Sequence, residues 1–193
     1  MKLWQKDKAS LKEVEIFTVG KDREMDSYLA AFDVLGSLAH IQMLESVGLL
    51  TKNELPQLQQ ELKNIYKQIQ NGEFKLQEDV EDIHSQVELL LTQKLGDVGK
   101  KIHAARSRND QVLVDIKLYL RNELEELVKT IQPFFELLQV QSEKYRDHLL
   151  PGYTHLQLAM PSSFGVWFGA YAESLVDDMI TLKGAFDVVN KNP

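Results

Sequence analysis

The chain has 193 residues and a formal net charge of −7, with 44% hydrophobic and 26% charged residues, which is the balance of a folded, soluble protein. The excess of acidic residues argues against nucleic-acid binding, and the absence of cysteine excludes disulfides, thiolate metal ligands and a cysteine nucleophile. The N-terminus lacks the apolar core of a signal peptide, and no apolar run approaches the ~20 residues that span a bilayer. We therefore expect a cytoplasmic protein with no membrane segment.

Helical periodicity dominates the first half of the chain. Residues 1–22 have no persistent period and are expected to form an arm. Helices are expected over 24–47, from a capping box at Thr51 to about residue 70, and from about Glu78 to Leu95. The apolar positions that define them are Leu29, Phe32, Gly36, Ala39 and Met43; Leu55, Leu58, Leu62, Ile65 and Ile69; and Ile83, Val87, Leu90, Leu91 and Leu95. No stretch alternates as a strand does, so residues 1–106 are predicted to form a small all-α domain.

Much longer helices are expected after residue 106. Apolar residues recur at steps of three or four from Leu113 to Leu138, which predicts a helix over 107–148 that Pro133 bends without ending. Pro161 suits the first turn of a final helix over 161–189, in which Gly165 and Gly169 would admit a close neighbour. Such long stripes need partners, so residues 107–193 are predicted to be the first part of a long-helix bundle shared between subunits.

The segment His103–Gln111, HAARSRNDQ, concentrates polar groups just before the longest helix. Ser107 followed by Asp110 is a helix-start signal. The positive end of a helix, with Arg106 and Arg108 beside it, suits a carboxylate or phosphate group. The alternative is a capped helix whose charges are simply solvated.

Two of the five histidines stand out. His155 lies in PGYTHLQ, which we expect to be a loop between two helices, and histidine titrates near neutral pH, as proton transfer requires. His84 lies in the acidic helix start EDIH, whose spacing could support a metal, but no convincing set of partner ligands accompanies it. We therefore expect no metal ion.

In this order along the chain, EDIH, HAARSRNDQV and PGYTHLQ resemble the argininosuccinate lyases of the fumarase/aspartase superfamily. Asp33–His40, DVLGSLAH, also resembles the first helix of that family. The resemblance runs from about Asp26 to Pro193. It implies an all-α homotetramer with a central bundle of long helices, whose active sites combine three regions from different subunits. The implied reaction is the cleavage of argininosuccinate to arginine and fumarate.

Carried over by position, the resemblance makes Asn109 and Thr154 substrate-binding residues and His155 an acid/base residue. Ser107, Arg108 and His84 are weaker candidates for lining the same pocket. The chemistry agrees, because argininosuccinate carries carboxylates that clustered donors would bind. β-Elimination removes a proton next to a carboxylate and expels a guanidinium nitrogen, which a histidine can protonate without any cofactor.

The sequence departs from the family pattern at several points. Ala104 and Ala105 replace the usual Thr-Gly, while Leu158 and Met160 replace an Arg and a Gln. The N-terminal family motif survives only as Leu3-Trp4, and Asp22 stands near an expected serine. These changes keep two alternatives open: a related enzyme such as adenylosuccinate lyase, or a non-catalytic scaffold like the crystallin relatives.

The family's third motif, a Gly-Ser-Ser-x-Met-Pro loop with the expected catalytic base, is absent from these 193 residues. The last residues, Asn190–Pro193, read as though the chain were cut within a longer protein. We therefore expect this segment alone to be inactive.

Overall fold

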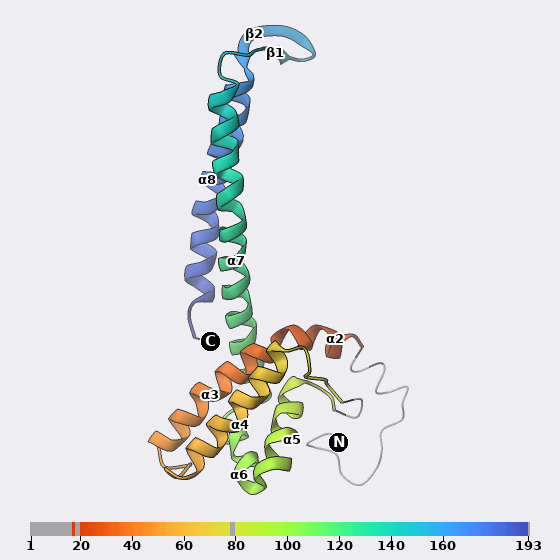
Figure 1. Cartoon of the computed structure of the whole chain (residues 1–193), viewed down its shortest axis with the longest axis vertical. Coiled ribbons are helices and arrows are strands. Elements are labelled where there is room, and N and C mark those ends of the chain that lie inside the picture. Colours follow the sequence, from red (N-terminus) through yellow and green to blue (C-terminus); the bar gives the residue numbers. More distant parts are fainter. Residues whose placement is uncertain (1–16, 18–19, 78–79, 193) are drawn as a thin grey trace. The chain divides into compact units, whose positions relative to one another are not determined.

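The computed structural model describes residues 17, 20–77 and 80–192. Most of them are helical, which confirms the expected all-α class, although one β-hairpin interrupts it (Figure 1). In chain order, the elements are α2 (Asp22–Asp26), η1 (Ser27–Leu29), α3 (Ala30–Ser46), α4 (Glu54–Gln70), α5 (Ile83–Leu95), α6 (Asp97–Lys100), η2 (Lys101–His103), α7 (Arg108–Lys144), β1 (Leu149–Thr154), β2 (Gln157–Ser163) and α8 (Phe164–Val189).

The chain divides into two compact units, one of residues 1–119 with 192–193 and the other of residues 120–191. Helix α7 begins in the first unit and continues into the second. The domain boundary expected after residue 106 stays a prediction. The arm expected over 1–22 and the Leu3-Trp4 remnant lie largely outside the described residues.

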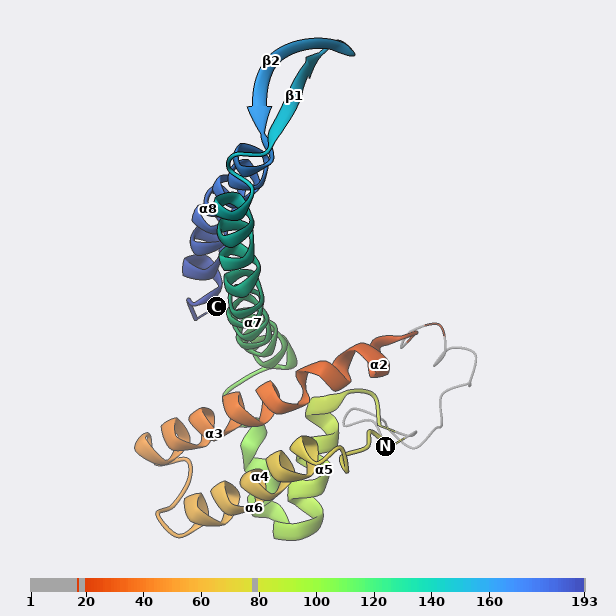
Figure 2. The ribbon, with the colours of Figure 1, turned by 45° about the horizontal axis from the view of Figure 1, so that its top comes forward.

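The core of the first unit lies among α3, α4 and α5 (Figure 2). The amphipathic stripe expected for α4 is confirmed, since Leu58, Leu62 and Ile65 are buried. Val87 and Leu91 of α5 enter the same core. Gly99 of α6 lies so close to α5 that an added Cβ would stand 2.4 Å from the carbonyl carbon of Leu91. A side chain there would force α6 away from α5.

The expectation of a single helix over 24–47 is corrected in two respects. The 3-10 turn η1 separates α2 from α3, and the buried face of α3 differs from the expected one. Ala39 and Met43 are exposed. The buried face consists of Ala30, Asp33, Val34, Ser37, Ile41 and Leu44. Two polar residues therefore face the core, at positions that apolar periodicity alone does not reveal.

The capping box expected before α4 is confirmed. Thr51 and Glu54 form a reciprocal capping box before α4, with Thr51 N–H donating to Glu54 at 2.8 Å and Glu54 N–H donating to Thr51 Oγ1 at 3.3 Å. Helix α5, in contrast, begins at Ile83 with Asp82 as its cap, later than the expected start near Glu78. Glu78 itself lies outside the described residues.

The second unit is an antiparallel pair of long helices joined by a hairpin (Figure 1). Helix α7 continues through Pro133, as expected, but ends at Lys144 and not near His148. In the described residues of this and the first unit, no helix combines the length and apolar character needed to cross a bilayer.

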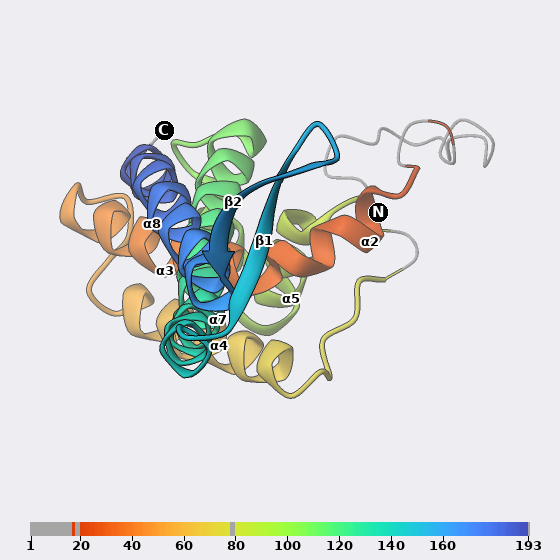
Figure 3. The same ribbon diagram turned by 90° about the horizontal axis from the view of Figure 1, so that it is seen from above.

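The hairpin corrects two further expectations. Strands β1 and β2 pair in antiparallel register, with Leu149 opposite Ser163 and Thr154 opposite Gln157 (Figure 3). Pro161 lies within β2 and does not start a helix. Helix α8 begins instead at Phe164, capped by Ser163, whose Oγ accepts a hydrogen bond from Val166 N–H at 3.2 Å.

The close approach expected at Gly165 is confirmed. A Cβ at Gly165 would stand 2.5 Å from the Cα of Arg146 and 2.7 Å from the carbonyl oxygen of Ser142. The Ser142 hydroxyl also donates to the Gly165 carbonyl at 2.7 Å. Gly169 is less crowded, since its nearest neighbour would be Ser142 Oγ at 3.4 Å. Gly165 therefore sets the spacing between the end of α7 and the start of α8.

Candidate functional site

The starts of α5 and α7 meet through an ion pair between Asp82 and Arg108. Asp82 caps α5 by accepting a hydrogen bond from Ser85 N–H at 2.8 Å. Its other oxygen, Oδ2, lies 2.6 Å from Arg108 Nε. Asp82 is buried, whereas the side chain of Arg108 is 52% exposed. Asp82 therefore holds the Nε edge of the Arg108 guanidinium, while the rest of this cation remains open to solvent.

The charges around this pair favour its ionised form. Burial opposes ionisation of Asp82, but hydrogen bonds from Ser85 and Arg108 hold its pKa below the usual range. Burial likewise opposes the Arg108 charge, yet Asp82 raises the pKa of Arg108. Asp26 accepts from Ile83 N–H at 3.4 Å, and burial raises the pKa of Asp26. The end of α2 thus also touches the first turn of α5.

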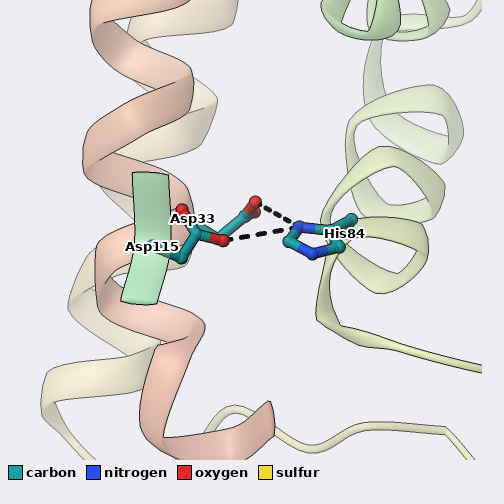
Figure 4. Close-up of side chains that lie close together, drawn as sticks. All are labelled: Asp33, His84 and Asp115. Atoms are coloured by element: carbon teal, nitrogen blue, oxygen red, sulfur yellow. Dashed lines mark hydrogen bonds and ion pairs between the residues drawn. The ribbon is translucent and has the colours of Figure 1, made fainter. Parts of the chain in front are cut away.

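Behind this turn lies a buried polar cluster formed by Asp33, His84, Gln111 and Asp115 (Figure 4). His84 Nδ1 lies 2.6 Å from Asp33 Oδ1 and 3.6 Å from Asp115 Oδ2. Gln111 Nε2 donates weakly to the same Asp33 oxygen at 3.5 Å. Asp33 and Asp115 are each 1% exposed, and His84 is 7% exposed. The cluster joins α3, α5 and α7 inside the first unit.

Burial and mutual repulsion decide the protonation of this cluster. Burial, together with the charge of Asp33, raises the pKa of Asp115 to about 8. Asp115 therefore holds a proton at neutral pH. Burial alone would lower the pKa of His84, but its hydrogen bond to Asp33 and the nearby carboxylates raise it. The bond to Asp33 thus favours the protonated form of His84, beside the neutral carboxyl group of Asp115.

Asp33, His84 and Asp115 are also described residues whose donor atoms lie close enough together, within 4.8 Å, to hold a metal ion. An ion with metal–ligand bonds of about 2 Å keeps its ligand atoms about 3 Å apart or more. The His84–Asp33 contact of 2.6 Å is shorter and has the length of a charge-assisted hydrogen bond. This geometry fits a proton between the two groups better than a metal ion, and the expected absence of a metal stays a prediction.

In the segment His103–Gln111, some polar side chains hold the fold and others lie on the surface. Ser107 and Asp110 cap α7 reciprocally, with Ser107 N–H donating to Asp110 at 2.6 Å and Asp110 N–H to Ser107 Oγ at 3.4 Å, which confirms the expected helix start. Asn109 is exposed on the first turn. Arg106, which the sequence suggested as an anion ligand, instead points inward, donating to Ser37 Oγ at 3.0 Å and to the Ile102 carbonyl at 3.2 Å. Among these arginines, Arg108 is the one oriented for binding.

Thr154 and His155 lie in the second unit, at the tip of the hairpin, so the expectation of a plain loop is corrected. His155 and Leu156 have positive φ angles of 46° and 63°, the pattern of a two-residue type I′ turn between Thr154 and Gln157. Histidine tolerates this conformation better than leucine does. All three side chains from Thr154 to Leu156 are exposed, and Leu156 is 94% exposed. The turn thus presents His155 to solvent.

The chain matches the model of the family described as lyase over residues 7–193. The chain belongs to this lyase family. It is 64% identical over 192 residues to an argininosuccinate lyase of Bacteroides fragilis and 36% identical over 192 residues to one of Thermotoga neapolitana. The alignments cover all of this chain but only 43% and 48% of the two relatives. The chain therefore spans less than half of their length.

The fold has solved counterparts. A structure from Brucella melitensis described as fumarate lyase:delta crystallin superposes with a TM-score of 0.71 at 15% identity, covering 88% of this chain and 42% of that one. These matches confirm the resemblance to the argininosuccinate lyases and the helical fold of the superfamily.

The sequence patterns did not identify Asp33 and Asp115 as members of the cluster. Asp115 lies four residues after Gln111, on one face of α7, and Asp33 lies among the buried positions of α3. Their signal was a polar residue at helical spacing among apolar ones. It becomes meaningful only when the three helices are known to meet.

Proposed function

We propose that the complete protein carrying this chain cleaves argininosuccinate to arginine and fumarate by cofactor-independent β-elimination. The observation that supports this most strongly is the 64% identity to an argininosuccinate lyase along the whole chain. The motif residues Asn109, Thr154 and His155 are all present. Arginine biosynthesis in the cytoplasm is the corresponding cellular role.

Arg108, Asn109 and Ser107 are proposed to bind the carboxylates of the substrate at the start of α7. Asp82 contacts Arg108 at Nε. This leaves the edge with the two Nη atoms, whose spacing matches the two oxygens of a carboxylate. The positive end of α7 adds to the attraction. Ser107 also caps the helix, so its hydroxyl has a structural role whatever it binds.

His155 is proposed to protonate the departing guanidinium nitrogen, with Thr154 binding the substrate beside it. The hairpin turn supports this assignment, because it holds an exposed imidazole at the end of two paired strands. Non-glycine residues with positive φ cost free energy and concentrate at functional sites. We assign the abstraction of the proton from carbon to none of the described residues, and we expect residues 1–193 alone to show no turnover.

The second unit is proposed to assemble into a homotetramer through its long helices. Large apolar side chains are exposed along both α7 and α8. Examples on the two helices are Leu127, Phe134, Leu137, Val140, Val166, Trp167, Tyr171 and Ile180. So many exposed large apolar side chains on two neighbouring helices are unusual for a monomer. In such an assembly, the site around Arg108 and the turn at His155 would be combined from different subunits.

The test is to follow fumarate release by the complete protein with argininosuccinate and, separately, with adenylosuccinate. We expect fumarate and arginine from the first substrate and no product from the second. Cleavage of adenylosuccinate alone would reassign the enzyme within the superfamily. A folded protein that cleaves neither would support the non-catalytic scaffold instead.

A further inference from the structure

A continuous chain of contacts runs from the buried cluster to the exposed guanidinium of Arg108. At the buried end, His84 Nδ1 and Asp33 Oδ1 form a bond of 2.6 Å between α5 and α3. His84 is the second residue of α5, and Asp82 caps the same turn. Asp82 in turn accepts from Arg108 Nε at 2.6 Å. The first turn of α5 therefore links a buried ion pair to a solvent-exposed cation.

This turn depends on such contacts for its position. The described residues just before it, 73–77 and 80–81, belong to no helix or strand, so no regular element holds the start of α5 from behind. Besides Asp115, 3.6 Å from His84, and Arg108 on the capping Asp82, two further side chains from outside α5 contact its first turn: Asp33 through His84, and Asp26 through the Ile83 amide at 3.4 Å. The shorter of these bonds is the ion pair, and it lies in the core, where water does not compete.

We propose that the Asp33–His84 pair is a positioning device for Arg108: it holds the first turn of α5 against α3, so that Asp82 orients the guanidinium toward a carboxylate of the substrate. This inference rests on the proposed function, because it takes Arg108 as a substrate-binding residue. His84 then acts from inside the protein through Nδ1 and does not touch the substrate.

The orientation of the imidazole ring supports this role. Figure 4 shows both carboxylates on the Nδ1 side of His84, from α3 and α7. Asp33 and Asp115 thus share the inner edge of the ring, and the His84 side chain is only 6% exposed. Moving a binding group by about 1 Å can lower the reaction rate by up to ~10²-fold. A contact at His84, two residues from Asp82, can therefore affect how well Arg108 is placed.

Two substitutions at His84 separate positioning from direct contact. In His84→Asn, the side-chain amide can donate to Asp33 from about the place of Nδ1, but it does not reach beyond. In His84→Ala, the bond is lost. In the complete protein at neutral pH, we expect His84→Ala to raise KM for argininosuccinate about tenfold, with a smaller change in kcat, and His84→Asn to stay within about threefold of the wild type. The same tenfold rise in both variants would mean that His84 contacts the substrate itself, and would overturn the proposal.

A double-mutant cycle with Arg108→Ala tests whether the effect passes through Arg108. If it does, adding His84→Ala to Arg108→Ala changes KM less than about twofold, because the positioned group is already absent. Independent effects that multiply would overturn the proposal. Asp97→Asn, at an exposed side chain of α6, is the matched control for charge, and Leu62→Ala is the control for a destabilised core; neither is expected to change KM.

The remaining outcomes are also decisive. If His84→Ala does not fold, His84→Asn alone decides: a KM within about threefold of the wild type supports positioning, and a tenfold rise contradicts it. Dialysis against EDTA is expected to leave KM unchanged. A loss of turnover that added Zn²⁺ reverses would show that the cluster binds a metal ion. A wild-type protein that does not turn over argininosuccinate would refute the proposed function. Turnover by the wild type with no effect of either His84 substitution would refute only the positioning role.

Discussion

Ala105 holds a backbone conformation that is unfavourable for any residue with a Cβ. Its φ angle is 60°, just before Arg106, and it stands where the argininosuccinate lyases usually have glycine. The left-handed conformation costs an L-residue about 1–2 kcal/mol, and a glycine at this position avoids that cost. Part of the gain is offset because glycine makes the unfolded chain more flexible. We therefore expect Ala105→Gly to stabilise the protein by up to about 1 kcal/mol. Thermal unfolding measures this, and an unchanged or lower melting temperature would show that the Ala105 methyl group contributes packing that outweighs the strain.

Asp115 makes the first unit sensitive to alkaline pH. Its pKa in the folded protein is about 8, well above the value of 3.8 for a free aspartate. The folded state therefore binds more protons than the unfolded state between these values, and stability falls as pH rises from about 4 to about 8. The raised pKa of His84 acts in the same direction. The groups that face Asp115 are Asp33 from α3, His84 from α5 and the Arg106 guanidinium.

The corresponding variant is Asp115→Asn, which cannot titrate. Between pH 6 and pH 8, the wild type should lose stability relative to Asp115→Asn by up to about 1.4 kcal/mol per pH unit. Chemical denaturation of both proteins at the two pH values measures the difference. Parallel stability curves would show that Asp115 is ionised throughout and that the charges around it compensate for its burial.

At the scale of elements, the capping signals before α4 and α7 predicted where these helices start. Contacts between helices that are distant in the sequence had no comparable signal. The capping pair Ser107–Asp110 lies within one turn, so its sequence determines its geometry. The hairpin gave no such signal, because its turn residues are His155 and Leu156, in place of the Asn-Gly that type I′ turns favour. The Asp33–His84 pair joins residues 51 positions apart, and no local pattern predicts which helices will meet.

Glycines in α8 allow a matched test of helix packing. At Gly165, an added Cβ would stand 2.7 Å from the Ser142 carbonyl oxygen of α7 and 2.5 Å from the Cα of Arg146 just after it, whereas at Gly184 it would meet nothing within 4 Å. Gly165→Ala should therefore destabilise the protein by forcing α8 away from α7. Gly184→Ala should stabilise it by up to about 1 kcal/mol through helix propensity. Melting temperatures of the two variants compare them directly, and a loss at Gly184 would indicate that this position faces another subunit.

At the scale of the whole molecule, the exposed apolar faces of α7 and α8 predict an obligate assembly. Their periodicity in the sequence indicated a bundle because a long apolar stripe requires a partner. We expect the complete protein to be a tetramer by light scattering at micromolar concentration. Substituting the exposed Ile180 or Leu137 by Asp should dissociate it or make it aggregate. A well-folded monomer at that concentration would contradict the proposed assembly and the sharing of sites between subunits.

The proposed reaction depends most on His155 as the group that protonates the leaving guanidinium, and the direct measurement is turnover of argininosuccinate by His155→Asn in the complete protein. His148→Asn is the matched control, since His148 is an exposed histidine of the same unit whose ring contacts Tyr145. General acid catalysis is typically worth ~10²–10⁴-fold. We predict a loss of kcat in that range for His155→Asn with KM nearly unchanged, and wild-type kinetics for His148→Asn. A loss below about tenfold for His155→Asn would remove His155 from the chemistry and contradict the proposed role of the hairpin turn.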